Sequence, residues 1–173
     1  MNNSGYNVEV IQGLFELSTE KMQNKHFSII ILSSLLHEVE KPQLFLQSIE
    51  NIAAKDSIIH LNVPNGRSFH RLLALESGLI GDVAEFSNNN IVFQQHNVFT
   101  MDTLLEIIKN SIQHEIEVLD FGSYFVKPFT HQQMTKMLNE NIINENILDG
   151  FQKMIKYMPE IGSEIFIDFK IKL

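Results

Sequence analysis

The chain has 173 residues, of which 44% are hydrophobic and 20% charged, and this length suits a single domain, residues 1–173, with its own core. The formal net charge of −8 argues against nucleic-acid binding, and the absence of cysteine excludes disulfides and thiolate metal sites. The sequence shows neither a signal peptide nor an apolar run long enough to span a bilayer, so we expect a cytoplasmic protein with no membrane partner.

The first half of the chain predicts a strand–helix–strand unit. Residues 6–12 are β-branched and alternating, which predicts a short strand. Residues 27–32 are continuously apolar, which is typical of a strand buried on both faces of a parallel sheet. A helix is predicted from Pro42 to about Ala54, and an apolar strand over residues 57–63. The connection between the two apolar strands is short and helical, so they should be parallel.

The second half alternates helices and strands. Residues 67–75 are compatible with one helix, and the glycines and the Ser-Asn-Asn-Asn run between residues 78 and 90 indicate loops. Thr100 and Thr130 are predicted helix caps, the second for a helix that extends to residue 138. A further helix is expected over residues 145–158, and a strand over residues 115–122. Residues 164–173 alternate apolar with polar side chains, which favours a half-exposed strand at a sheet edge.

Polar residues follow both central strands. Ser33, Ser34, His37 and Glu38 come after the first strand, and Asn65 comes after the second. In open parallel sheets ligands bind outside the carboxyl ends of the strands, so these residues are candidates for a binding cleft. The same serines and acidic turn are equally consistent with simple capping of the next helix. Adjacent His37 and Glu38 point in different directions, and neither has a histidine partner at helical spacing, so we reject a metal site.

The second candidate group is Asn65, Arg67, His70 and Arg71, which contains the only two arginines of the chain. If this stretch is helical, residues 67, 70 and 71 share one face and could hold a carboxylate or phosphate. A solvated surface is the competing interpretation, although two arginines beside a strand end in an acidic protein favour a site. His96, Lys127 and His131 are isolated polar residues that are more often structural than catalytic.

Several segments, taken in order, resemble class I S-adenosylmethionine-dependent methyltransferases. Residues 27–42, FSIIILSSLLHEVEKP, are similar to the fourth strand and following turn of that family, and LNVPN at residues 61–65 to its fifth strand. Residues 65–73, 96–100 and 122–128 match a subgroup that acts on small molecules, the methyltransferase type 11/12-like proteins. The resemblance implies an α/β, Rossmann-like, mostly parallel sheet with helices on both faces and one antiparallel strand near the edge, which residues 164–173 would supply.

The resemblance also implies S-adenosylmethionine as cofactor and a small-molecule acceptor. It places four residues near the cofactor, Ser33, Ser34, Leu36 and His37. Five residues would border the acceptor, Asn65, Arg67, His70, Arg71 and Lys127. The candidates for a general base are His37, His70 and His96, and nothing in the sequence chooses among them. The usual Glu-His order of the family appears here as His37-Glu38.

The sequence departs from the family at its beginning. The glycine-rich loop after the first strand and the acid-terminated second strand do not occur in these residues, so residues 6–12 would correspond to the third strand, with Leu14 or Phe15 where an acid often stands. We therefore expect two N-terminal βα units to be missing, about 60 residues at roughly 30 per unit. Cofactor binding should then be weak. Residues 27–32 would present an apolar edge that pairs with residues 6–12, with a second copy or with a partner chain.

Two main functions are compatible with these features. The first is methyl transfer to a small-molecule acceptor, with this chain as the C-terminal part of the enzyme and impaired alone. The second is a non-catalytic, methyltransferase-like interaction subunit that completes its sheet with a partner chain. A different α/β protein that binds nucleotides or sugars is a weaker third option, which rests on fold analogy alone.

Overall fold

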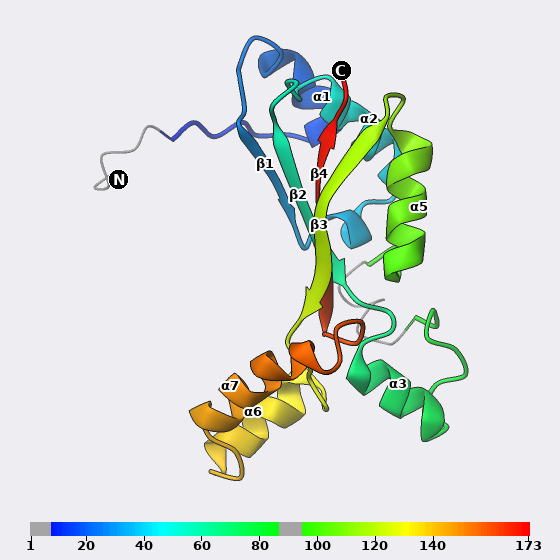
Figure 1. Ribbon diagram of the computed structural model, residues 1–173, viewed down its shortest axis with the longest axis vertical. Coiled ribbons are helices and arrows are strands. Elements are labelled where there is room, and N and C mark those ends of the chain that lie inside the picture. Colours follow the sequence, from blue (N-terminus) through cyan, green and yellow to red (C-terminus); the bar gives the residue numbers. More distant parts are fainter. Residues whose placement is uncertain (1–7, 87–94) are drawn as a thin grey trace.

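The computed structural model describes residues 8–86 and 95–173. Within these residues a four-stranded sheet has the order β1-β2-β4-β3 (Figure 1). The strands are β1 (Ile29–Ser33), β2 (Ile58–Pro64), β3 (Ile116–Tyr124) and β4 (Glu164–Ile171). β1 and β2 are parallel, whereas β4 is antiparallel to both β2 and β3. The chain is therefore an α/β protein with a mixed sheet.

The parallel β1–β2 pair confirms the predicted strand–helix–strand unit. β1, β2 and β3 run in one direction and β4 alone is reversed, so the mostly parallel sheet with one antiparallel strand is also confirmed. Only one of its three strand pairings is parallel, because the last strand inserts between β2 and β3. The prediction from its alternation that the last strand lies at an edge is therefore wrong, whereas the antiparallel strand near the edge that the resemblance implies is found. β4 alternates buried and half-buried side chains because one face of the sheet lacks a cover, and not because one of its edges is free.

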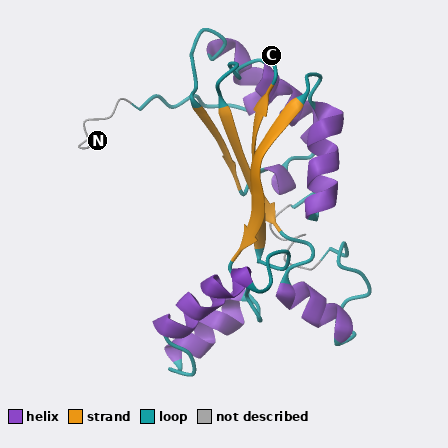
Figure 2. Ribbon diagram, viewed as in Figure 1, coloured by secondary structure: helices purple, strands orange, loops and turns teal. Residues whose placement is uncertain are grey.

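The core lies between one face of the sheet and two helices, α2 (Pro42–Glu50) and α5 (Met101–Ser111) (Figure 2). The predicted helical spacing explains this packing, since it gathers the apolar side chains of each helix on one face. The sheet contributes Ile30, Leu32, Ile59, Leu61, Val63, Ile165, Ile167, Phe169 and Ile171 to the core, and the helices contribute Phe45, Leu46, Ile49, Leu104 and Ile108. The short helix α1 (Phe15–Ser18) packs against α2, with the rings of Phe15 and Phe45 5.0 Å apart.

The opposite face of β1 is open. Ile29 and Ile31 are 60% and 66% exposed, so the prediction that this strand is buried on both faces is wrong. In the described part of the chain, α2 and α5 cover the other face, and the expected helices on both faces are not found. Residues 8–12 form no strand and do not pair with β1, which leaves the outer edge of β1 without a described partner. Tyr6 and Asn7 of that predicted strand lie outside the described residues.

Three helices lie beyond one end of the sheet (Figure 1). They are α3 (Phe69–Glu76), α6 (His131–Asn139) and α7 (Glu145–Lys153), which tightens into η3 (Met154–Lys156). The helix predicted over residues 67–75 begins later because Ser68 has an extended backbone at its N-cap, so Arg67 does not share the α3 face. The α-helix predicted over residues 145–158 ends at Lys153, where the 3₁₀ turn η3 begins, and its Ile147 is 44% exposed. Residues 87–90 of the predicted loop lie outside the described residues.

Two further turns of 3₁₀ helix complete the described elements, η1 (Thr19–Lys21) and η2 (Leu36–Glu38). η2 occupies the turn that the sequence places after β1. The helix that follows, predicted to extend to about Ala54, ends at Glu50. Ile52 lies beyond that end, yet it is still buried against the core.

Thr130 caps α6 as predicted. Its hydroxyl accepts from the Gln133 backbone N–H at 3.3 Å, and the Thr130 N–H donates to Gln133 Oε1 at 2.9 Å. We expect Thr130→Ala to lower the free energy of unfolding by about 1 kcal/mol, because the Gln133 backbone N–H in the first turn loses its hydrogen-bond partner. Urea unfolding measures this change. Thr135→Ala, in the same helix but away from its cap, should change stability by less than about 0.5 kcal/mol. Equal effects of the two substitutions would contradict the capping role.

Candidate functional site

A cluster of hydrogen bonds around the Glu164 carboxylate lies where β1 and β2 end. Glu164 Oε2 accepts from Asn62 Nδ2 at 2.6 Å, from the Tyr124 hydroxyl at 2.9 Å and from the Ser34 hydroxyl at 3.4 Å. Asn62 is only 3% exposed, and its Nδ2 also lies 3.4 Å from Ser34 Oγ. Ser34 has a positive φ of 48°, which turns the chain sharply after β1. The cluster thus connects the ends of β1, β2 and β3 to the start of β4.

The sheet register explains this cluster. β4 is antiparallel, so its first residue, Glu164, lies opposite Pro64 at the end of β2 and opposite Tyr124 at the end of β3. Burial, together with the hydrogen bond to Glu164 and the charge of that carboxylate, raises the pKa of the Tyr124 hydroxyl to about 12. Tyr124 therefore stays protonated at neutral pH and donates to the carboxylate. The sequence interpretation did not single out this group, and the only signal for it was polar Asn62 inside an apolar strand.

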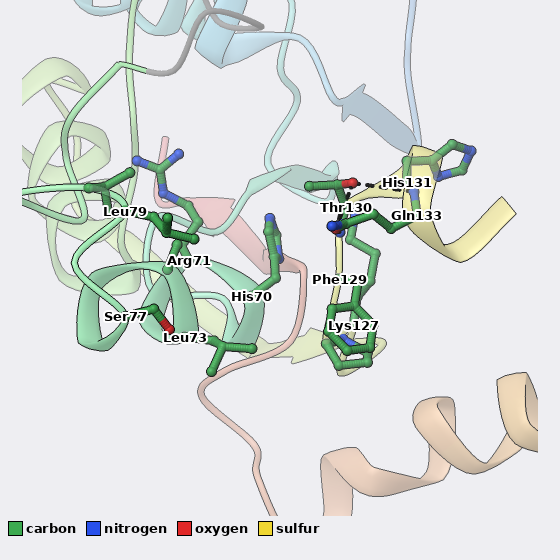
Figure 3. Close-up of a pocket in the computed structure, with 13 residues that line it drawn as sticks. His70, Arg71, Leu73, Ser77, Leu79, Lys127, Phe129, Thr130, His131 and Gln133 are labelled. Atoms are coloured by element: carbon green, nitrogen blue, oxygen red, sulfur yellow. Dashed lines mark hydrogen bonds between the residues drawn. The ribbon is translucent and has the colours of Figure 1, made fainter. Parts of the chain in front are cut away.

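A pocket of about 570 Å³ lies between α3 and the segment that leads into α6 (Figure 3). It brings together three predicted acceptor-site residues, His70 and Arg71 from α3 and Lys127 from the segment after β3. The other lining residues are Leu73, Ala74, Ser77, Leu79, Ile80, Pro128, Phe129, Thr130, His131 and Gln133. Two segments 57 residues apart in sequence (70 to 127) thus form one concave surface. Its wall is mainly apolar, with a few cationic or polar groups.

His70 and Lys127 differ in charge. Burial, together with the nearby Lys127 and Arg71 charges, lowers the pKa of the His70 imidazole to about 4, so the ring is neutral at pH 7. His70 Nδ1 is buried without a hydrogen-bond partner among the described residues. Burial also lowers the pKa of the Lys127 ammonium, while the Glu164 carboxylate opposes this shift.

Arg71 holds the loop that follows α3. Its Nε and Nη2 donate to the Val83 carbonyl at 3.1 Å and 2.7 Å, and Nη2 also donates to the Glu85 carbonyl at 2.6 Å. Burial lowers the pKa of the Arg71 guanidinium, and the Glu85 and Asp82 carboxylates counteract this shift. Much of the donor capacity of Arg71 is therefore used to fix residues 83–85 against α3.

Asn65 and His37 meet Arg71 at a second, much smaller cavity of about 30 Å³. The Asn65 side chain is already occupied, since its Nδ2 donates to the carbonyls of Glu160 and Gly162, each at 2.9 Å. His37 is 4% exposed, and burial lowers the pKa of its imidazole, although Glu38 and Glu164 raise it. A cavity of this size holds about one water molecule rather than a substrate.

The remaining predicted residues are dispersed. Ser33 and Ser34 are exposed at the end of β1, whereas the side chain of Leu36 is fully buried in the core. His96 is exposed and lines a different pocket, of about 610 Å³, beside α1 and η2. Arg67 is exposed and lines none of the three cavities described above. The structure therefore unites His70, Arg71 and Lys127 and separates them from His96.

Metal ligation and membrane insertion find no support in residues 8–86 and 95–173. No group of three or more histidine, aspartate or glutamate side chains in these ranges is placed to hold a metal ion. No helix in the same ranges is both long and apolar enough to cross a bilayer.

Solved structures with a similar fold are S-adenosylmethionine-dependent methyltransferases. A SAM-dependent methyltransferase from Archaeoglobus fulgidus has a TM-score of 0.51 and 13% identity, over 98% of this chain and 69% of that one. A SAM-dependent methyltransferase from Thermotoga maritima, described as a possible histamine N-methyltransferase, has a TM-score of 0.55 and 15% identity, over 95% of this chain and 65% of that one. No protein-family model and no curated protein matches the sequence.

These similarities confirm the coarser part of the fold implied by the sequence resemblance, an α/β fold with a mixed sheet like that of methyltransferase structures. Over most of its length, and at low sequence identity, the chain has a fold similar to that of these two S-adenosylmethionine-dependent methyltransferases. It spans about two thirds of the length of these two neighbours, 69% and 65%.

Proposed function

We propose that the chain is the C-terminal part of an S-adenosylmethionine-dependent methyltransferase, a single domain that lacks two N-terminal βα units and acts on a small-molecule acceptor. The observation that carries this proposal is one pocket, in a methyltransferase-like fold, that unites His70, Arg71 and Lys127. These are three of the five residues that the sequence resemblance assigned to the acceptor site. A pocket of about 570 Å³ is of the size that small-molecule sites usually have.

The described residues do not by themselves fit S-adenosylmethionine. Of the four residues proposed to lie near this cofactor, Ser33 and Ser34 are exposed and can offer hydroxyls, whereas Leu36 and His37 are buried. Two hydroxyls are too few for a ligand that carries an amino acid end, a ribose and an adenine. We therefore infer that most of the cofactor cradle comes from N-terminal units outside this sequence.

Among the three histidines proposed as general bases, His70 is the one that lines the acceptor pocket. Its pKa of about 4 makes it a weak base at neutral pH. A hydrogen-bonding role toward the acceptor therefore suits His70 better than proton abstraction. His37 is buried beside a cavity of about 30 Å³, and His96 lines a different pocket, so neither meets an acceptor bound at Lys127.

The coding DNA immediately upstream of Met1 tests this proposal. We expect an in-frame segment of the pattern Asp/Glu-x-Gly-x-Gly-x-Gly, and we expect the extended chain to transfer a radiolabelled methyl group from S-adenosylmethionine to a small molecule. Upstream DNA without such a frame, together with no transfer by the native protein, would contradict it.

The open edge of β1 favours a second candidate function, an interaction subunit that completes its sheet with a second copy or a partner chain. Ile29 and Ile31 expose apolar surface beside strand hydrogen-bonding groups that have no described partner, which is a common site for strand addition. Size-exclusion chromatography with light scattering distinguishes this candidate. A homodimer, or a stable complex in which Ile31→Lys abolishes association, would support it, and a stable monomer would contradict it.

A further inference from the structure

The pocket between α3 and α6 contains a cation that no ion pair within residues 8–86 and 95–173 neutralises. Lys127 makes no hydrogen bond or salt bridge within the described residues, and the acidic group that acts on its pKa is Glu164. The Glu164 carboxylate is itself committed to Asn62 and Tyr124 through hydrogen bonds of 2.6 Å and 2.9 Å. An anion that enters the pocket therefore meets an ammonium group that is already partly desolvated, which strengthens their attraction.

His70 supplies a neutral group beside this cation. Its Nδ1 is buried and has no hydrogen-bond partner among the described residues. Figure 3 shows the ring extending from α3 into the space in front of Phe129 and Thr130. A neutral imidazole carries one N–H donor, so a ligand oxygen in the pocket can accept a hydrogen bond from the His70 ring.

The third basic residue of the pocket adds little free charge. Arg71 donates to the carbonyls of Val83 and Glu85, and the Asp82 and Glu85 carboxylates act on its guanidinium. The pocket therefore offers about one uncompensated positive charge, at Lys127. This arrangement suits a singly charged carboxylate better than a phosphate monoester, which carries between one and two negative charges at neutral pH.

The rest of the wall combines polar Ser77, Thr130, His131 and Gln133 with apolar side chains that are open to a ligand. Leu79 is 78% exposed, Leu73 41% and Phe129 39%, and all three line the pocket. Large exposed apolar side chains that border one concave surface are a common feature of binding sites. A hydrocarbon chain or an aromatic ring would cover them.

We propose that this pocket binds a small organic acid with an apolar body, whose carboxylate pairs with Lys127 and hydrogen-bonds to His70 while its hydrocarbon part covers Leu79 and Phe129. This inference rests on the proposed function, and it identifies the chemical class of the methyl acceptor. An acceptor of this class carries a carboxylate for recognition and a separate nucleophilic atom for methylation.

A matched set of four probes tests the proposal by isothermal titration of the native chain without S-adenosylmethionine. The probes are 3-phenylpropanoate, 3-phenylpropan-1-ol, 3-phenylpropylammonium and phenyl phosphate, which share an aromatic body and differ in charge. We expect 3-phenylpropanoate to bind at least tenfold more tightly than each of the other three. Binding of the alcohol or the ammonium with equal affinity would overturn the proposal, as would tighter binding of phenyl phosphate or no binding of any probe at about 10 mM.

Three substitutions locate the binding. Lys127→Gln should weaken the binding of 3-phenylpropanoate about tenfold and leave the affinity for 3-phenylpropan-1-ol unchanged. Phe129→Ser should weaken the binding of both probes. Lys136→Gln removes an exposed lysine of α6 that pairs with Glu140 and does not line this pocket, so it should change neither affinity. Circular dichroism verifies that each variant is folded. Unchanged binding by Lys127→Gln would overturn the proposal. Because no cofactor is present, this failure would leave the methyltransferase proposal itself intact.

Discussion

Titration of S-adenosylmethionine into the 173-residue chain should reveal no binding tighter than about 1 mM. Ser33 and Ser34 are the only exposed residues of the four that we expect near the cofactor, and Leu36 and His37 are buried. The sequence contains no glycine-rich loop whose backbone could approach the cofactor closely. On binding, most polar groups of the cofactor would therefore lose hydrogen bonds to water without gaining equivalent hydrogen bonds to the protein.

A dissociation constant near 1 μM would contradict this expectation, since it corresponds to about 4 kcal/mol more binding free energy than 1 mM. In that case Ser34→Ala shows whether the cofactor lies at the end of β1, because loss of affinity would place it there. S-adenosylhomocysteine serves as the matched ligand. It has the same amino acid, ribose and adenine groups as S-adenosylmethionine, and it lacks only the methyl group and, with it, the positive charge on sulfur.

Gly162→Ala should destabilise the protein by more than 3 kcal/mol, or prevent folding. A Cβ at residue 162 would lie 2.5 Å from Ser123 Oγ, 2.6 Å from the Tyr124 nitrogen and 2.7 Å from the Tyr124 oxygen, and two of these are backbone atoms that cannot rotate away. The same residue donates to Ser123 Oγ at 3.0 Å and accepts from Asn65 Nδ2 at 2.9 Å. Displacing it would therefore disturb the junction of β2, β3 and β4.

The control for this substitution is Gly150→Ala. An added Cβ at residue 150 meets nothing within 4 Å, and this glycine lies inside α7, so alanine should stabilise the helix by up to about 1 kcal/mol. Thermal and urea unfolding compare both variants with the native chain. A Gly162→Ala variant as stable as the native protein would show that the backbone around residue 162 adjusts more easily than its contacts imply.

Local signals predicted the elements of the chain well. The apolar runs located β1 and β2, helical spacing located α2 and α5, and Thr100 and Thr130 cap α5 and α6 as expected. Errors arose where a pattern depends on neighbouring elements. The apolar run of β1 does not reveal whether one or both faces are covered, and the alternation in β4 is the same for an edge strand as for an inner strand of a half-covered sheet.

The candidate site was only partly predictable, for a similar reason. His70 and Arg71 are neighbours in sequence, and the family resemblance added Lys127, so these three residues were identified in advance. The Glu164 cluster was not, because Asn62, Tyr124 and Glu164 come from three separate strands that only the antiparallel register of β4 brings together. A cluster of this kind can be predicted only once the pairing of the strands is known.

The position of β4 has a consequence for synthesis of the protein. The strand nearest the C-terminus lies in the interior of the sheet, and β2 and β3 each pair with it rather than with one another. While the ribosome still holds residues 164–171, the β1–β2 pair and β3 have no hydrogen-bonded connection to each other within the described sheet. The described sheet forms only after Ile171 has emerged from the ribosome. Removal of residues 164–173 should therefore separate β3 from the β1–β2 pair, whereas removal of an edge strand would leave the other strands paired.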